Sequence, residues 1–125
     1  MSGTPDPKTR PTGKGRAFRI VATKDEWATI AAAKQGPCRV CVLPESNGSY
    51  WKQIELHHVI PRSRGGDDVP ANIVPLCRYC HGLVSAYDAE ALRKLGRSLS
   101  PDERGYVVQM LGEYGPERLF GREGS

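Results

Sequence analysis

The stretch LHHVIPRSRGGDDVPANIVPLCRYCH, residues 56–81, decides the fold, because it sets metal-type ligands among turn signals at close spacing. It contains all three histidines of the chain, two of them adjacent as His57 and His58. The pair Cys77 and Cys80 follows, directly before His81. Packing alone does not explain this concentration, so the middle third of the chain is expected to carry the chemistry.

Outside this stretch, the other two cysteines form a second Cys-x-x-Cys pair, Cys38 and Cys41. Two residues between ligands let a tight turn direct both sulfurs to one metal, and Zn²⁺ takes four thiolates in closed structural sites. In a reducing cytosol, two such pairs favour one structural zinc over two disulfides or a redox role. Four thiolates leave no open position, so a catalytic zinc is not expected here.

The histidines suit a different site. Imidazole has an unperturbed pKa of about 6.5, so it accepts a proton from water near neutral pH, and its neutral nitrogen binds divalent metals. With His57 and His58 adjacent and His81 nearby, one ring can act as a base while others hold an ion. The alternative is that His81 replaces a cysteine as a zinc ligand.

Taken together, the adjacent histidines, Asn72, the final histidine and both cysteine pairs resemble the signature of the HNH endonucleases, in the family's order and spacing. The resemblance implies an α+β fold with a small ββα-metal (treble-clef) core that contains structural Zn and is flanked by helices. Its first strand would carry His57 and His58, its second would follow Asn72, and its helix would carry His81 in the first turn.

The resemblance also implies metal-dependent hydrolysis of DNA phosphodiester bonds, with nicking of one strand and cleavage of both strands as open alternatives. His58 would be the general base, and His57 and His81 would hold one divalent ion, Mg²⁺ or another such as Mn²⁺ or Ni²⁺. Asn72 would either orient His58 or join the metal shell. Arg62, Arg64 and Arg78 are candidates to bind flanking phosphates, with a solvated surface charge as an equal alternative.

Two expectations concern the strand that carries the histidines. Consecutive strand residues point to opposite faces, so bringing His57 and His58 to one phosphate requires a twist or bulge near 59–61. Glu55 shares the face of His57, and we interpret it as an exposed strand glutamate in preference to a partner for an imidazole.

Capping signals predict the helices. Thr23 with Glu26 begins one that stops at Gly36-Pro37, and Trp27 and Ile30 are expected in its core contacts. Ser100-Pro101 with Glu103 begins another that ends near Gly112. Its apolar stripe is expected to pack on the zinc core and comprises Tyr106, Val107, Met110 and Leu111.

The other expected elements are strands at 50–59 and 73–76, a helix from the second cysteine pair to the mid-80s, and a helix over 89–95. Residues 1–19 carry five basic residues against Asp6 and lack hydrophobic periodicity, so we expect a basic disordered tail suited to a polyanion. Residues 20–125 are expected to form one nuclease domain, with a core at 36–87 and C-terminal helices at 88–115.

No apolar run approaches the length of a membrane span, and the sequence predicts a cytoplasmic protein, in the host cytoplasm if it is encoded by a phage. DNA is the expected partner. The alternative function is a non-catalytic, zinc-stapled DNA-binding protein. Small phage HNH proteins that resemble this chain act beside a DNA-packaging motor, so a phage terminase is the partner expected for an accessory role.

Overall fold

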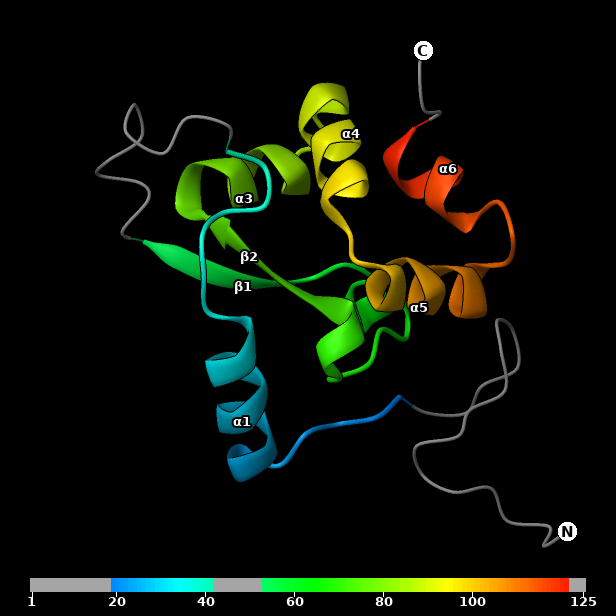
Figure 1. Cartoon of the computed structure of the whole chain (residues 1–125). Coiled ribbons are helices and arrows are strands. Elements are labelled where there is room, and N and C mark those ends of the chain that lie inside the picture. The colour runs from blue at the N-terminus through cyan, green and yellow to red at the C-terminus, as the bar shows by residue number, and fades with distance from the viewer. Residues whose placement is uncertain (1–18, 42–52, 122–125) are drawn as a thin grey trace, which may run out of the picture.

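A computed structural model describes residues 19–41 and 53–121, and Figure 1 shows the arrangement of its elements. Two antiparallel strands lead directly into a helix, which confirms the predicted α+β fold with a ββα core. Most of the basic tail and the turn at 46–49 lie outside the described residues. The elements are α1 (Lys24–Lys34), β1 (Ile54–His58), η2 (Arg62–Arg64), η3 (Pro70–Asn72), β2 (Ile73–Cys77), α3 (Arg78–Ser85), α4 (Ala89–Ser98), α5 (Pro101–Leu111) and α6 (Gly115–Phe120).

The two strands pair residue for residue, from Ile54 opposite Cys77 to His58 opposite Ile73. β1 contains no bulge, and a bend at Val59 and Ile60 follows it, within the segment 59–61 where a twist or bulge was expected. β2 is buried along its whole length, as its continuous apolar sequence requires. The first three residues of the strand expected at 50–59 fall outside the described part of the chain.

The loop between the strands folds tightly back on itself. A Cβ atom at Gly66 would lie 1.7 Å from the carbonyl oxygen of Ile60, so only glycine fits there. The side chain of Asn72 binds the same loop from its other end and is fully buried. The loop is therefore held in one conformation beside the end of β1.

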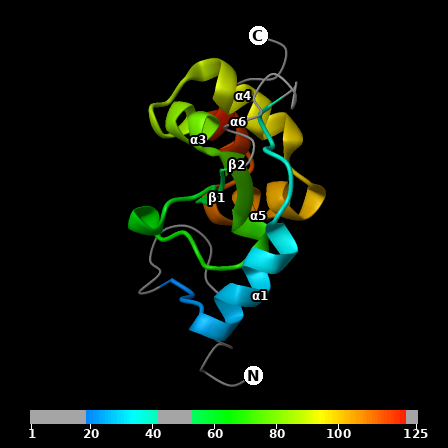
Figure 2. The same ribbon diagram turned by 90° about the vertical axis from the view of Figure 1, so that its left-hand side faces the viewer.

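Helix α1 begins at the predicted capping box, in which Thr23 and Glu26 bond each other's backbone N–H groups. It lies on one side of the strands, whereas α3, α4 and α6 lie on the other (Figures 1 and 2). Ile30 is buried, as expected. Trp27 is only half-buried, and its ring belongs to the site described below.

The C-terminal helices pack against one another over the strands (Figure 1). The Ser100–Glu103 capping box of α5 is confirmed, and α4 extends three residues beyond the predicted 89–95. The sequence did not predict α6. Its Phe120 packs so closely on α4 that a Cβ atom at Gly96 would come within 2.7 Å of it, so Gly96 is what allows the two helices to meet.

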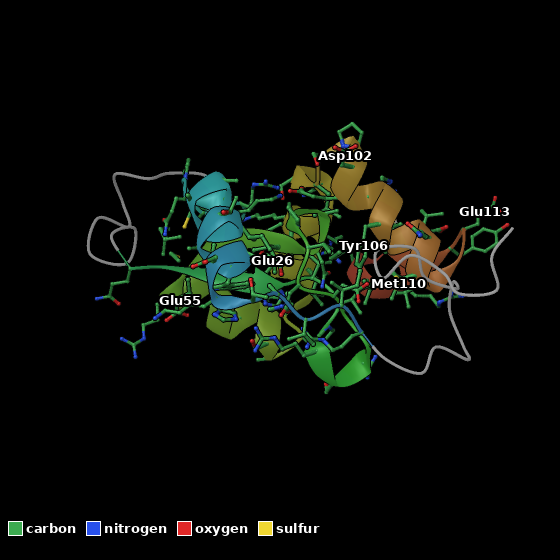
Figure 3. The ribbon with its side chains drawn as sticks, turned by 90° about the horizontal axis from the view of Figure 1, so that it is seen from below. Glu26, Glu55, Asp102, Tyr106, Met110 and Glu113 are labelled. Atoms are coloured by element: carbon green, nitrogen blue, oxygen red, sulfur yellow. The ribbon has the colours of Figure 1, made fainter. Side chains whose placement is uncertain are left out.

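The buried side chains form two clusters. Val107 packs in the larger one, with the cysteines and β2, as predicted. Tyr106 and Met110 instead pack with Ile60 under the loop between the strands, so their expected contact with the zinc core is wrong. Figure 3 labels Tyr106 and Met110, which both come from α5. No helix in the described parts of the chain is long and apolar enough to span a bilayer.

Glu103 joins three distant segments. Its carboxylate, 2% exposed, accepts two hydrogen bonds from Arg39, at 2.8 and 2.9 Å, and one from Lys34 at 2.5 Å. Burial opposes its ionisation, but these cations outweigh burial and lower the pKa of Glu103 to about 2. The end of α1, the first cysteine pair and α5 are thereby tied together.

We expect the Glu103→Gln variant to lose about 3 kcal/mol of unfolding free energy at pH 7, because its amide leaves two cations without their anion. The depressed pKa makes this contribution complete above about pH 4.5 and progressively lost as the pH falls toward 2. Urea unfolding of wild type and variant between pH 7 and 2.5 measures it. If the difference in unfolding free energy between the two proteins stayed constant below pH 4.5, the ion pairs of Glu103 would not be its source. Changes in zinc affinity with pH are common to both proteins and cancel in the comparison.

Candidate active site

The four cysteines meet at one point. Cys38 and Cys41 follow α1, Cys77 ends β2, and Cys80 lies in the first turn of α3. Their sulfur atoms all lie within 4.8 Å of one another, and all four thiols are unpaired, which excludes disulfides. The Cys41 Sγ is 3.6 Å from both the Cys77 and the Cys80 Sγ. Four sulfurs bound to one Zn²⁺ at about 2.3 Å stand about 3.8 Å apart, so the cluster suits a structural zinc.

The local backbone supports thiolates at this position. Backbone N–H groups of Val40 and Cys41 donate to the Cys38 sulfur, and the N–H of Cys80 donates to the Cys77 sulfur, which caps α3. Burial raises the pKa of the Cys41 and Cys80 thiols, so a bound cation must displace their protons. Zinc binding is therefore expected to weaken as the pH falls.

His57 and His81 face each other across β1 and α3. Their ring centroids are 5.0 Å apart with an interplanar angle of 73°. Burial first, and then the neighbouring histidines, lower the pKa of His57 to about 4, so its ring is neutral at pH 7 and has a lone pair for a cation. The structure thus brings together the two histidines that the sequence analysis selected as ligands of a divalent ion.

Glu55 orients one of these rings. Its Oε1 is 2.7 Å from the His81 Nδ1, and its other oxygen lies 4.0 Å from the Arg78 Nε. A histidine that donates one ring N–H to a carboxylate presents its other nitrogen to a metal. Glu55 is therefore more than the exposed strand glutamate that we expected, although its side chain is 42% exposed.

His58 lies in a separate network. Its Nε2 is 2.8 Å from the Asp68 Oδ1, and its ring stacks on Trp27 with centroids 5.7 Å apart and planes 5° from parallel. Burial opposes ionisation of Asp68, but the Ala22 N–H, His58 and two arginines outweigh burial and lower its pKa. An ionised carboxylate only accepts, so Nε2 carries the hydrogen and Nδ1 keeps the lone pair when the ring is neutral.

The carboxylate of Asp68 also contacts two arginine side chains. Arg19 forms an ion pair with Asp68, and the Arg62 Nε lies 3.3 Å from it. The chain near Arg19 is also fixed by backbone bonds, including Asp68 N–H to the Ile20 carbonyl at 2.9 Å. Arg19 is thus docked at the site, although the sequence analysis assigned it to the disordered tail.

Asn72 is fully buried, and it binds backbone rather than ligand. Its Oδ1 accepts from the Ile60 N–H at 2.8 Å, and its Nδ2 donates to the carbonyl groups of Ile60 and Asp67, both at 3.0 Å. Its own carbonyl accepts from the Val59 N–H, next to His58. The side chain therefore fixes the loop that begins at His58 and contains Asp68.

An open groove of about 610 Å³ runs past these residues. Its lining includes His57, His58, His81, Trp27, Arg62 and Arg64. Arg62 and Arg64 are thus brought to the histidines, whereas Arg78 lies beside Glu55, with its side chain 71% exposed. Asp68 was not predicted as a site residue, and Trp27 was expected in the core.

Residues 38–86 match the family model described as HNH endonuclease. No curated protein and no solved structure gives a significant match to the chain. The matched segment contains both cysteine pairs, β1, β2, α3 and the three histidines. This family match indicates a nuclease-type domain with DNA as the substrate class. The resemblance to the HNH endonucleases that the sequence shows is thereby confirmed for residues 38–86.

Proposed function

We propose that this protein is a metal-dependent DNA endonuclease in which His58 is the general base. The observation that carries the proposal is the pairing of His58 Nε2 with the buried, ionised Asp68, in a groove that His57 and His81 also line. A base must keep a free lone pair within reach of its substrate. This arrangement provides one on Nδ1.

His57 and His81 would hold the divalent ion, Mg²⁺ or another such as Mn²⁺ or Ni²⁺. Such an ion, when bound, polarises the phosphate and stabilises the departing oxygen. Two imidazoles suit an ion that completes its shell with water and phosphate oxygens. Glu55 fixes the ring of His81 for this purpose.

His58 would take a proton from a water molecule through Nδ1 while the water oxygen attacks phosphorus in line. The bond from phosphorus to the 3′ oxygen breaks, and that oxygen is protonated by solvent, which leaves 5′-phosphate and 3′-hydroxyl ends. Asp68 stabilises the imidazolium that forms, and Asn72 keeps Asp68 and His58 on one rigid loop. Of the two roles considered for Asn72, its burial favours orientation over metal binding.

Arg62 and Arg64 would bind phosphates on either side of the scissile bond. Both are exposed on the lining of the groove, and a guanidinium binds phosphate oxygens in bidentate fashion. Arg78 would contact the backbone near Glu55. Phosphate contacts carry no sequence information, so we expect weak sequence preference. We also expect nicking, that is, cleavage of one strand of the duplex.

The test is cleavage of supercoiled plasmid by the zinc-loaded protein, without added ion and with Mg²⁺, Mn²⁺ or Ni²⁺. The expected result is nicking that requires an added ion. No cleavage with any ion, by protein that still contains its zinc, would refute the proposal and favour a non-catalytic binding or packaging role.

Replacement of Asp68 by Asn is expected to lower kcat about 100-fold with little change in KM. An amide can donate to Nε2 and so move the ring hydrogen to Nδ1, which removes the lone pair that the reaction needs. Plasmid nicking measures the rate, and ¹⁵N NMR of the His58 ring reports the tautomer. The matched control is Arg19→Gln, which removes another partner of the same carboxylate and should keep both kcat and tautomer. Asp68 would not be a positioning residue if the two variants behaved alike.

A further inference from the structure

A second pocket, of about 200 Å³, opens between α4, α5 and α6, outside the segment that matches the HNH model. Its lining includes Arg93 and Arg97 from α4 and Arg104 from α5. Among the described residues of the lining, Glu117 is the only acidic one. The described lining therefore holds three guanidinium groups and one carboxylate, which is an excess of positive charge.

The three arginines differ from most other cations of the protein. Within residues 19–41 and 53–121, the side chains of Arg19, Lys34, Arg39, Arg62, Arg78, Lys94 and Arg118 all have a carboxylate or carbonyl partner. The side chains of Arg93, Arg97 and Arg104 have no hydrogen bond or ion pair to any described residue. Like charges that converge without a counter-ion are unfavourable in the free protein, so an anion bound among them would be stabilised.

The pocket adjoins the catalytic groove. Phe120 is on the lining of both. Because Gly96 lets Phe120 pack directly on α4, these helices hold the two surfaces in a fixed relation. Helices α4, α5 and α6 can be followed together in Figure 1.

We propose that Arg93, Arg97 and Arg104 bind a backbone phosphate of the DNA substrate beyond the groove. A duplex carries one negative charge per about 1.7 Å of its axis, so DNA that leaves the groove past Phe120 presents phosphates to this pocket. Guanidinium groups match phosphate oxygens in geometry and charge. The C-terminal helices thereby extend the DNA contact beyond the HNH segment. This inference rests on the proposed function, because it takes DNA as the substrate.

The test compares Arg97→Gln with Lys94→Gln. Both remove one positive charge from α4, but Lys94 pairs with Glu90 and is not part of the pocket lining. Binding of a fluorescein-labelled duplex is followed by anisotropy over a range of salt concentrations, with full-length protein carrying His58→Ala so that the duplex stays intact. We expect Arg97→Gln to raise Kd about tenfold and to reduce the slope of log K against log salt by about 0.9, whatever the DNA sequence. Lys94→Gln should change neither.

Equal Kd values and slopes for the two variants would overturn the pocket proposal, and plasmid nicking by the wild type would show that the proposed function still stands. A protein that neither binds nor cuts DNA would overturn both. Calorimetric titration with inorganic phosphate separates a DNA contact from a site for a free anion. If Arg97→Gln abolished phosphate binding and left the Kd for DNA unchanged, the pocket would serve a free anion and the inference would be wrong.

Discussion

The His58→Ala variant is expected to nick plasmid DNA 100- to 10,000-fold more slowly than the wild type, because it lacks the group that takes the proton from water. The fold should persist. His58 is the last residue of β1, with its side chain 14% exposed, and Asp68 keeps its bonds to Arg19, Arg62 and the Ala22 N–H when the imidazole is removed. We expect a loss of about 1 to 2 kcal/mol in unfolding free energy, from the stack on Trp27 and the bond to Asp68.

Three measurements separate a catalytic from a structural effect: nicking rate, zinc content and thermal unfolding. Free imidazole should restore part of the rate of His58→Ala, because it can enter the open groove and supply a base, whereas it cannot repair a damaged fold. Glu90→Gln, an exposed change on α4, is the control that should leave all three measurements unchanged. Cleavage by His58→Ala at the wild-type rate would remove His58 from the mechanism.

The parts of the structure that were predictable from sequence are those encoded locally. Helix caps at Thr23 and Ser100 define where α1 and α5 begin, because each satisfies N–H groups within its own first turn. The two Cys-x-x-Cys pairs predict a shared metal for a similar reason, since ligand spacing is a property of one turn. The match to the HNH family extends this reasoning to the order of β1, β2 and α3.

The parts that were not predictable depend on segments meeting in space. Trp27 has the helical spacing of a core residue, yet α1 sets its ring against His58 rather than under the sheet. Asp68 follows a glycine turn and has no local mark of function. Of the partners of its side chain, only Arg62 is near in sequence. His58 is ten residues away, and Arg19 and Ala22 lie in the segment before α1. Arg19 lies in a run of basic and turn-forming residues, and its position depends on tertiary contacts, namely its ion pair with Asp68 and its bond to the Gly66 carbonyl.

Helix α6 was also not predictable from the sequence, because it depends on tertiary contacts. Residues 115–120 are too few to show a hydrophobic period, and the segment begins with Gly115 and Pro116. Its helix is fixed by tertiary contacts, with Phe120 against Gly96 and Gly115 against Leu111 and Val107. Short helices of this kind gain most of their stability from packing, so their sequences predict them poorly.

Loss of one zinc ligand is expected to have the largest effect on stability. Cys77 is fully buried, and it both ends β2 and caps α3, so Cys77→Ser removes a metal ligand at the junction of the ββα core. Structural zinc sites contribute about 10 to 16 kcal/mol of apparent binding free energy, which equals or exceeds the whole stability of a typical domain. We therefore expect Cys77→Ser to lose zinc and to lack a cooperative thermal transition by circular dichroism.

Two further variants make this expectation specific to zinc. Arg78→Gln, adjacent in sequence but largely exposed, should keep its zinc and its transition. Cys41→His should keep at least part of both, because imidazole is a zinc ligand and Cys41 is only half-buried, which leaves room for the larger ring. Histidine cannot form a disulfide, so a zinc-bound, folded Cys41→His protein would identify metal binding as what the four cysteines provide. A folded, zinc-free Cys77→Ser protein would show instead that the ββα core is stable on packing alone.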